Sequence, residues 1–124
     1  MKVVVDSLTG LSWRFASHLK YDCIKIGDID LANFNEKFFL VTRCYGFGEI
    51  PDSTIKLLRR YYLNCVGVAV SGNRNWGSNY CIVGDKIENI YNIPCVCKFE
   101  GSGFSKDWQI VNEFIDEVVT NAGK

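Results

Sequence analysis

The chain is poor in several kinds of residue, and each scarcity excludes a class of function. Its 124 residues include one histidine, His18, which cannot build a histidine-rich metal site. Lysine plus arginine equals aspartate plus glutamate at 14 each, and a neutral chain without a basic cluster gives no support for nucleic-acid binding. No apolar run reaches the roughly 20 residues of a membrane-spanning helix. We therefore expect a cytoplasmic protein with no nucleic-acid partner, no membrane association and no metal.

Several motifs of nucleotide and hydrolase chemistry are also missing. The loop after the first apolar run contains neither the Gly-x-x-x-x-Gly-Lys-Ser/Thr of ATP and GTP P-loops nor the dinucleotide motif Gly-x-Gly-x-x-Gly. There is no serine elbow, Gly-x-Ser-x-Gly, and no Cys-x5-Arg of a low-molecular-weight phosphatase. A phosphotransfer receiver needs an aspartate at the end of the third strand, where Thr42 and Arg43 stand.

The cysteines are numerous but do not follow a metal or thioredoxin spacing, because no Cys-x-x-Cys occurs. We expect no disulfides, since no signal peptide precedes the first apolar run and an apolar content of 48% builds a core without covalent links. The six cysteines are Cys23, Cys44, Cys65, Cys81, Cys95 and Cys97.

Short apolar runs alternate with stretches of helical periodicity, which predicts βαβ units and a parallel sheet. Five strands joined by crossover helices predict one flavodoxin-like α/β domain over residues 1–124, with sheet order 2-1-3-4-5 and helices on both faces. The strands are expected at 2–5, 23–26, 37–42, 66–70 and 95–99, and the helices at 12–19, 52–63, 85–91 and 108–119.

Two helices carry more detailed expectations. The helix near 52–63 should be capped by Asp52 or Ser53 and should bury a face at helical spacing. The last helix should bury a longer apolar stripe. The inward residues are expected to be Ile55, Leu58 and Tyr62 in the former, and Ile110, Val111, Phe114, Ile115 and Val118 in the latter.

The loops after the first, third and fourth strands should meet at one edge of the sheet, where open α/β sheets bind ligands. The first loop, 7–12, is rich in Ser, Thr and Gly and precedes a helix, which suits a phosphate; an ordinary helix cap is the alternative. Tyr45 and Phe47 could flank a planar ring or fill the core, and Trp76 and Tyr80 could stack on a ring, although Trp76 could equally anchor the core. Together the loops favour flavin mononucleotide (FMN).

Five stretches in order along the chain resemble the NrdI family, the flavodoxin-like FMN proteins of the class Ib ribonucleotide reductase system. The block Ser-Gly-Asn-Arg-Asn-Trp-Gly at 71–77 is the most specific of them. The stretches are Ser7-x-Thr9-Gly10-x3-Arg14-Phe15, Tyr45-Gly46-Phe47-Gly48-Glu49-Ile50-Pro51, Gly67-Val68-Ala69-x-Ser71-Gly72-Asn73-Arg74-Asn75-Trp76-Gly77, Tyr91-Asn92-Ile93-Pro94 and Lys98-Phe99-Glu100.

The resemblance implies a function as well as a fold. Reduced FMN would react with dioxygen to supply a superoxide-level oxidant, which activates the dimanganese-tyrosyl radical cofactor of the reductase small subunit. It also implies an electron donor of the reductase, flavodoxin or ferredoxin type. The cofactor-binding residues it implies are Ser7, Leu8, Thr9, Gly10, Leu11 and Ser12 for the phosphate, and Thr42, Arg43, Cys44, Tyr45, Gly46, Phe47, Gly48, Ser71, Gly72, Asn73, Trp76, Gly77, Tyr80 and Cys81 near the ring.

Three positions depart from the family pattern. Asp6 stands where an aromatic or apolar residue is common, and an acid near the phosphate would cost affinity unless it turns away. Arg43 and Cys44 occupy positions that are often small or apolar. Cys44 and Cys81 would be sensitive to oxidation if the chemistry makes peroxide.

Charge near the ring bears on the kind of redox chemistry. One-electron flavodoxins usually surround the ring with acids, which disfavours the fully reduced anionic flavin. Here the ring loops carry Glu49 against Arg43 and Arg74, so full reduction should be easier. Replacing both arginines with glutamate should then lower the second reduction potential.

Two alternatives remain open at this point. One is a conventional one-electron-transfer flavodoxin, and the other is a flavin-free interaction module that keeps the fold. If the chain is an activator, we expect its partner surface around the flavin face, at Phe47, Glu49, Asn75 and Trp76.

Overall fold

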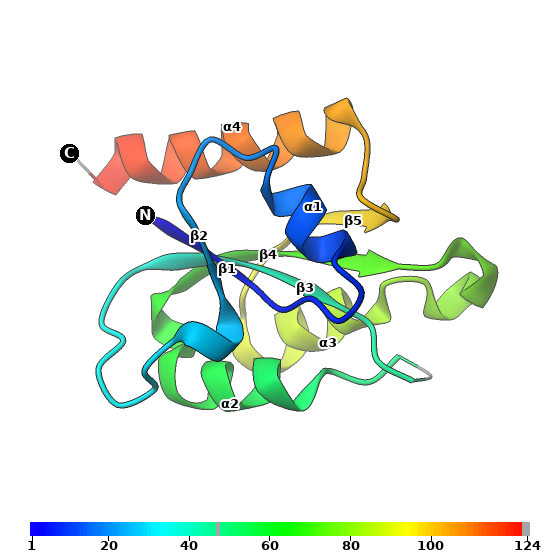
Figure 1. Cartoon of the computed structure of the whole chain (residues 1–124), viewed down its shortest axis with the longest axis horizontal. Coiled ribbons are helices and arrows are strands. Elements are labelled where there is room, and N and C mark those ends of the chain that lie inside the picture. The colour runs from blue at the N-terminus through cyan, green and yellow to red at the C-terminus, as the bar shows by residue number, and fades with distance from the viewer. Residues whose placement is uncertain (47, 123–124) are drawn as a thin grey trace.

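The computed structural model describes residues 1–46 and 48–122, so Phe47 and the last two residues lie outside the description. Five parallel strands form one sheet in the order β2-β1-β3-β4-β5, which confirms the predicted topology. Figure 1 shows the sheet between two layers of helices. The elements are β1 Lys2–Val5, α1 Leu11–Ala16, β2 Cys23–Lys25, η1 Ile26–Asp28, β3 Phe38–Arg43, α2 Asp52–Tyr61, η2 Tyr62–Asn64, β4 Cys65–Gly72, η3 Arg74–Asn79, α3 Ile82–Tyr91, β5 Cys95–Glu100 and α4 Ser105–Ala122.

The central strand β3 explains the two layers. Its apolar run is fully buried on both faces, as expected for a parallel strand covered by helices on each side. Because side chains alternate along a strand, Phe38 and Leu40 join the core beneath α2 and α3, whereas Phe39 and Val41 join the core beneath α1 and α4. The predicted helix layers on both faces are therefore confirmed.

Helix α2 differs from its predicted pattern by about one residue. Thr54, Leu57 and Leu58 are buried, whereas Tyr62 is 40% exposed and begins the short 3-10 turn η2. The predicted cap is also wrong, because Pro51 precedes the first helical residue and no side chain caps this end. A neighbouring hydroxyl, Ser53, donates instead to a buried carboxylate described below.

Helix α4 buries a narrower stripe than predicted. Val111 and Ile115 are fully buried and Phe114 and Val118 are half-buried, but Ile110 is 46% exposed. The prediction for Ile110 is therefore wrong, because a helix lying on a sheet turns only part of its circumference toward the strands.

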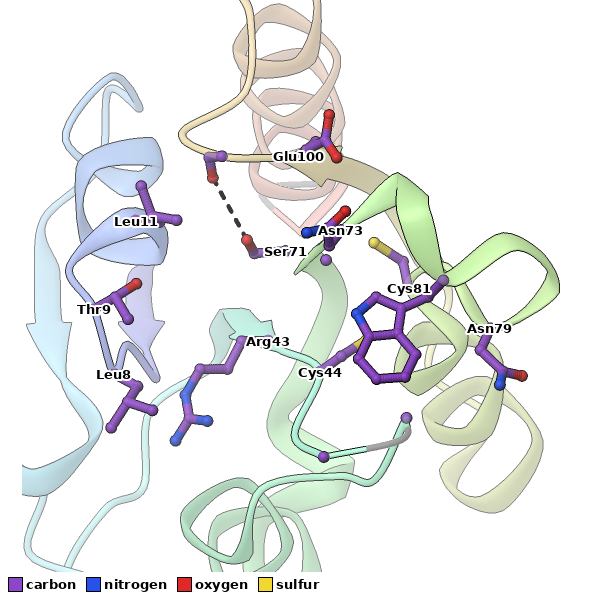
Figure 2. A pocket seen from close by; sticks show the side chains of 15 residues that line it. Leu8, Thr9, Leu11, Arg43, Cys44, Ser71, Asn73, Asn79, Cys81 and Glu100 are labelled. Atoms are coloured by element: carbon purple, nitrogen blue, oxygen red, sulfur yellow. Dashed lines mark hydrogen bonds between the residues drawn. The ribbon is translucent and has the colours of Figure 1, made fainter.

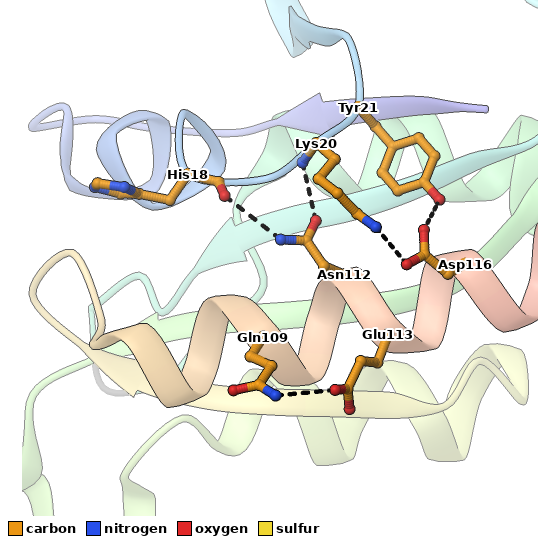
Figure 3. Close-up of polar contacts among 7 residues, drawn as sticks. All are labelled: His18, Lys20, Tyr21, Gln109, Asn112, Glu113 and Asp116. Carbon is orange, nitrogen blue, oxygen red and sulfur yellow. Dashed lines mark hydrogen bonds and ion pairs between the residues drawn. The ribbon is translucent and has the colours of Figure 1, made fainter.

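Polar contacts attach α4 to the segment between α1 and β2 (Figure 3). Asn112 accepts the Lys20 amide at 2.9 Å and donates to the His18 carbonyl at 3.5 Å. One turn later, Asp116 accepts the Lys20 ammonium at 2.5 Å and the Tyr21 hydroxyl. The Lys20 hydrogen bond lowers the pKa of Asp116. The contacts hold the α1 layer against α4, and α1 in turn supports the first loop of the site.

The interior of β4 leaves no room for a side chain at Gly67. A Cβ atom there would lie 2.8 Å from Phe114 Cε1 and 3.1 Å from both Phe39 Cε2 and Val96 Cγ2. We expect Gly67→Ala to lower the free energy of unfolding by about 1–3 kcal/mol through overpacking, measured by urea denaturation. The matched control is Gly27→Ala, where a Cβ meets nothing within 4 Å; equal stability of the two variants would contradict the packing argument.

Candidate functional site

A cavity of about 480 Å³ opens at the carboxyl ends of β1, β3, β4 and β5 (Figure 2). This volume is within the range of small-molecule sites. The first loop lies on one side, with Leu8, Thr9 and Leu11, while Asn79 and Cys81 lie opposite and Arg43 lies between. The sequence-predicted residues that line it are Leu8, Thr9, Leu11, Arg43, Cys44, Gly46, Gly48, Ser71, Gly72, Asn73, Trp76 and Cys81.

Other predicted residues are close to the cavity but are not among the described residues that line it. Ser7 and Gly10 line a second cavity of about 470 Å³, on the other side of the first loop. Ser12 and Thr42 are buried beneath the site, and Phe47 lies outside the described residues. Tyr45, Gly77 and Tyr80 are the remaining predicted residues that do not line the main cavity.

Three lining residues were missed by the sequence prediction: Asn79, Glu100 and Gly101. Glu100 ends β5, which pairs with the end of β4 through Gly72. The same strand-end rule that selected the other loops, applied to the fifth strand, would have found Glu100 and Gly101. Asn79 lies within the loop after the fourth strand, which that rule had already selected, but was not singled out there.

The first loop presents backbone donors to a ligand. Gly10 precedes α1 with φ 90°, a left-handed value that favours glycine, and its amide donates to Ser7 Oγ at 3.0 Å. The first helical hydrogen bond runs from the Arg14 amide to the Gly10 carbonyl. The amides of residues 11–13 therefore precede the helical pattern and are available to an acceptor. An ordinary Ser/Thr cap does not describe this end, because no side chain caps it.

The second loop is a tight turn that places Tyr45 outside. The Tyr45 amide donates to the Glu49 carbonyl at 2.9 Å, and the Glu49 amide donates to the Tyr45 carbonyl at 2.7 Å. Tyr45 is 53% exposed, so the alternative in which it fills the core is wrong. Gly48 has φ 98°, and a Cβ there would lie 2.5 Å from Ile82 Cγ2, so this close approach requires glycine.

The third loop is a 3-10 segment, η3, whose start is capped by Asn73, which accepts the Asn75 amide at 2.9 Å. Trp76 lines the cavity and is 45% exposed. It is therefore not the core anchor that the sequence left open. Tyr80 packs against the core beneath α2 and α3, with its ring 5.0 Å from the Arg74 guanidinium carbon, and is not among the described residues that line the cavity.

Asp6 turns away from the cavity and into the protein. It is 3% exposed and accepts hydrogen bonds from Ser53 Oγ at 2.5 Å and Thr54 Oγ1 at 2.7 Å. Its other oxygen lies 3.6 Å from an Arg43 guanidinium nitrogen. The expected cost of an acid beside a phosphate is thus avoided, because the carboxylate is used to hold α2 and Arg43.

The charge balance at the cavity differs from the one predicted. Arg43 lines it but is paired with Asp6, and Glu100 lines it as well. The Glu100 carboxylate accepts the Arg74 amide at 2.7 Å, while the Arg74 side chain lies over Tyr80. The prediction of a less negative ring site therefore omitted Glu100. Of the two arginines to be replaced with glutamate in the test of that prediction, Arg43 lines the cavity and Arg74 is not among the described lining residues.

Two cysteines line the cavity together. Cys44 follows β3 and donates its amide to the Ser71 carbonyl at 3.0 Å, while Cys81 precedes α3 with φ 52°. Interaction with the Cys81 thiol, helped by backbone donors and Lys86, lowers the pKa of Cys44 to about 6 despite partial burial. The same contact with Cys44, together with burial, raises the pKa of Cys81.

We expect Cys44 to be alkylated at neutral pH. Only the thiolate reacts, so the rate of iodoacetamide labelling should rise as pH increases through about 6. Peptide mass spectrometry against pH measures this midpoint. Cys23, whose pKa burial raises, is the internal control and should label only at alkaline pH. A Cys44 midpoint above 8 would contradict the assignment.

No group of three or more His, Cys, Asp or Glu that could hold a metal ion occurs among residues 1–46 and 48–122. Within the same residues, no helix is both long and apolar enough to span a bilayer. All six cysteines are free thiols.

The fold has close counterparts among solved flavodoxins. A short-chain flavodoxin associated with a non-canonical PDU bacterial microcompartment superposes with a TM-score of 0.77 and 19% identity, over 98% of this chain and 97% of that chain. The flavodoxin of Streptococcus pneumoniae TIGR4 gives 0.73 and 20%, over 97% of each chain. A Fusobacterium nucleatum flavodoxin, bound to flavin mononucleotide, gives 0.59 and 14%, over 97% of this chain and 96% of that one. These likenesses establish the fold.

Sequence relatives are more specific. The chain is 41% identical over 118 residues to Protein NrdI of Macrococcus caseolyticus, covering 95% of this chain and 91% of that protein. It is 35% identical over 123 residues to Protein NrdI of Bacillus licheniformis, covering 98% and 92%. The family model described as "NrdI Flavodoxin like" matches residues 3–113. The chain therefore belongs to the NrdI flavodoxin-like family.

Proposed function

We propose that the cavity binds FMN, with the phosphate on residues 7–12 and the flavin ring beside Trp76. The observation that carries this proposal is that three loops, far apart in the sequence, line one cavity of about 480 Å³ in a chain of this family. A ligand of this kind needs anion donors, a polar middle section and a flat contact. The described residues offer each of these.

The residues fit the group in chemical detail. Amides of residues 11–13 precede the first helical bond and can receive a phosphate without a lysine. Thr9, Ser71 and Asn73 line the cavity and can hydrogen-bond a polyhydroxyl chain. Ser71 already donates to the Gly101 carbonyl, at 3.5 Å (Figure 2), so it retains capacity to accept. The half-exposed Trp76 supplies a flat apolar surface.

We further propose that the chain activates the small subunit of a class Ib ribonucleotide reductase. The support is family membership together with the open cavity mouth. When bound and reduced by a donor of the reductase, flavodoxin or ferredoxin type, FMN would react with dioxygen and supply a superoxide-level oxidant for the dimanganese-tyrosyl radical cofactor. The chain itself holds the cofactor, exposes one edge of the site and offers a docking face.

The docking face that we propose surrounds the cavity mouth at Glu49, Asn75 and Trp76, all of which are exposed. The fourth residue of that sequence prediction, Phe47, lies outside the described residues. Leu8 at 71% and Tyr45 at 53% exposure add apolar surface nearby. Exposed apolar groups rimmed by polar ones are typical of protein-interaction sites.

FMN binding is tested by titrating the purified chain into FMN and following the quenching of flavin fluorescence. Riboflavin, which lacks the phosphate, is the matched ligand. We expect saturable binding of FMN and markedly weaker binding of riboflavin, because the loop amides have no anion to contact. Absence of FMN binding would leave the flavin-free interaction module as the remaining function for this fold.

Activation is tested separately. The FMN-loaded chain, reduced without oxygen, is mixed with a manganese-loaded class Ib small subunit and then exposed to air. We expect a tyrosyl radical signal by electron paramagnetic resonance that requires the chain, dioxygen and manganese together. Flavin binding without any radical would instead support a conventional electron-transfer flavodoxin.

A further inference from the structure

Two thiols from distant parts of the chain lie together in the cavity wall. Cys44 lies where β3 ends and Cys81 lies where α3 begins, and both line the cavity. Cys81 is 0% exposed, and its Sγ lies 3.3 Å from the Val70 carbonyl. A Cβ atom on Gly72 would lie 2.7 Å from the same sulfur. The Cys81 thiol is therefore closely enclosed by the end of β4.

The pair is asymmetric in access and in charge. Cys44 is partly exposed, whereas Cys81 is buried in the cavity wall. Both thiols line the same cavity, and interaction with Cys81 lowers the pKa of Cys44, whereas interaction with Cys44 together with burial raises the pKa of Cys81. Cys44 is therefore the thiol of the pair that ionises first. A partly exposed thiol of lowered pKa beside a partner of raised pKa is typical of a peroxide-sensing cysteine and its resolving cysteine.

We propose that Cys44 and Cys81 form a peroxide-oxidisable pair, in which Cys44 reacts with hydrogen peroxide and Cys81 resolves the product as a disulfide. This site goes beyond the flavin function and does not depend on it, since both sulfurs belong to the chain. Hydrogen peroxide is the oxidant, and other small hydroperoxides share its chemistry.

The reaction balances in two steps. In the first, the Cys44 thiolate attacks one peroxide oxygen, an S–O bond forms, the O–O bond breaks, and hydroxide leaves to become water with the proton that Cys44 had released. Sulfur loses two electrons and becomes a sulfenic acid. In the second, Cys81 loses its proton and attacks the Cys44 sulfur; an S–S bond forms, the S–O bond breaks, and a second water leaves. Two thiols and one peroxide give one disulfide and two waters.

The environment of Cys81 changes in the direction that the second step needs. The contact with the Cys44 thiolate is the main reason that the pKa of Cys81 is raised, with burial second. After the first step Cys44 is neutral, so that contact no longer opposes ionisation of Cys81. The resolving thiol is thus held protonated until its partner has been oxidised.

The other four cysteines lack this arrangement. Burial raises the pKa of Cys65 to about 12, of Cys95 to about 11 and of Cys97 to about 12, and it also raises the pKa of Cys23. At pH 7, a thiol of pKa about 6 is roughly thirtyfold more ionised than an unperturbed one of about 8.5. These four thiols therefore serve as internal controls.

The test uses the full chain at pH 7 with one equivalent of hydrogen peroxide. We expect intact-mass spectrometry to show a loss of about 2 Da, because two hydrogens leave as the disulfide forms. After unfolding in denaturant, so that buried thiols are also accessible, N-ethylmaleimide should label four thiols instead of the six free cysteines. Peptide mapping should join Cys44 to Cys81. In Cys81→Ser, which keeps a hydroxyl donor, dimedone should trap a sulfenic acid at Cys44.

Cys44→Ser should react with hydrogen peroxide at least about tenfold more slowly than the unsubstituted chain, because it removes the thiolate. Cys95→Ser keeps that thiolate and should react at the rate of the unsubstituted chain. Six free thiols after treatment, or a disulfide between other cysteines, would overturn the proposal. The first readout is made on the unsubstituted chain, so a negative result there cannot be attributed to misfolding of a variant. None of these readouts uses FMN, so failure here is distinguishable from failure of the proposed function.

Discussion

Replacement of Asp6 with alanine is expected to lower the free energy of unfolding by about 3 kcal/mol, at the lower end of the range for breaking a buried charge pair. The carboxylate is 3% exposed and joins three elements: it follows β1, accepts from Ser53 and Thr54 of α2, and lies 3.6 Å from Arg43 of β3. Its removal leaves two donors and one guanidinium without their acceptor.

The neighbouring polar contacts enlarge the effect. Thr54 also shares a hydrogen bond with Thr42 at 2.8 Å, and Ser12 Oγ donates to the Thr42 carbonyl at 3.4 Å. This chain of contacts extends from α2 to the start of α1, beneath the proposed phosphate loop. We therefore expect Asp6→Ala to weaken FMN binding as well, through displacement of Arg43 and the loop.

Urea denaturation measures the stability change. The matched control is Asp22→Ala, which removes an exposed carboxylate 3.9 Å from Lys2 and should change stability by less than about 0.5 kcal/mol, as is usual for surface pairs. If both alanine variants unfold at the same urea concentration, Asp6 does not organise the region in the way described.

Replacement of Trp76 with alanine is expected to weaken FMN binding by about tenfold to a hundredfold. The indole lines the cavity and is 45% exposed. A bound flavin ring could therefore cover part of this exposed surface. Stacking of a heterocyclic base on an aromatic side chain contributes about 1–3 kcal/mol, and each 1.4 kcal/mol corresponds to about tenfold in affinity. Stability should change little, because the ring is not part of the core.

Fluorescence titration gives the dissociation constant, and Trp76→Phe should restore much of the affinity by returning a flat ring. The control is Phe104→Ala, which removes an aromatic side chain that is 66% exposed and is not among the described residues lining the cavity. An affinity in Trp76→Ala equal to that of Phe104→Ala would show that the flavin ring does not rest on the indole.

The architecture was predictable because its signals are local. The run Phe38-Phe39-Leu40-Val41 is apolar at every position, and a parallel strand covered by helices on both faces buries all four. The right-handed crossover then restricts the strand order. The rule that ligands bind at strand ends predicted that separate loops, including those that carry Thr9 and Trp76, line one cavity.

Helix faces were less accurate, since a shift of one residue exposes one side chain and buries another. Tyr62 and Ile110 were placed inward by apolar spacing, yet the helices turn other residues to the sheet. The apolar character of a residue permits burial without requiring it, because a folded surface also contains much apolar area. Packing against the specific neighbours decided these positions.

The doubly wound sheet, the family and three of the loops that line the cavity follow from the amino-acid sequence, because strand periodicity and loop composition are properties of neighbouring residues. Three features follow from the packing of the folded chain: Asp6 turns inward to α2, Tyr80 packs against the core, and Cys44 and Cys81 line one cavity wall. These outcomes depend on contacts between residues far apart in the chain, whose geometry is set by how helices and strands pack.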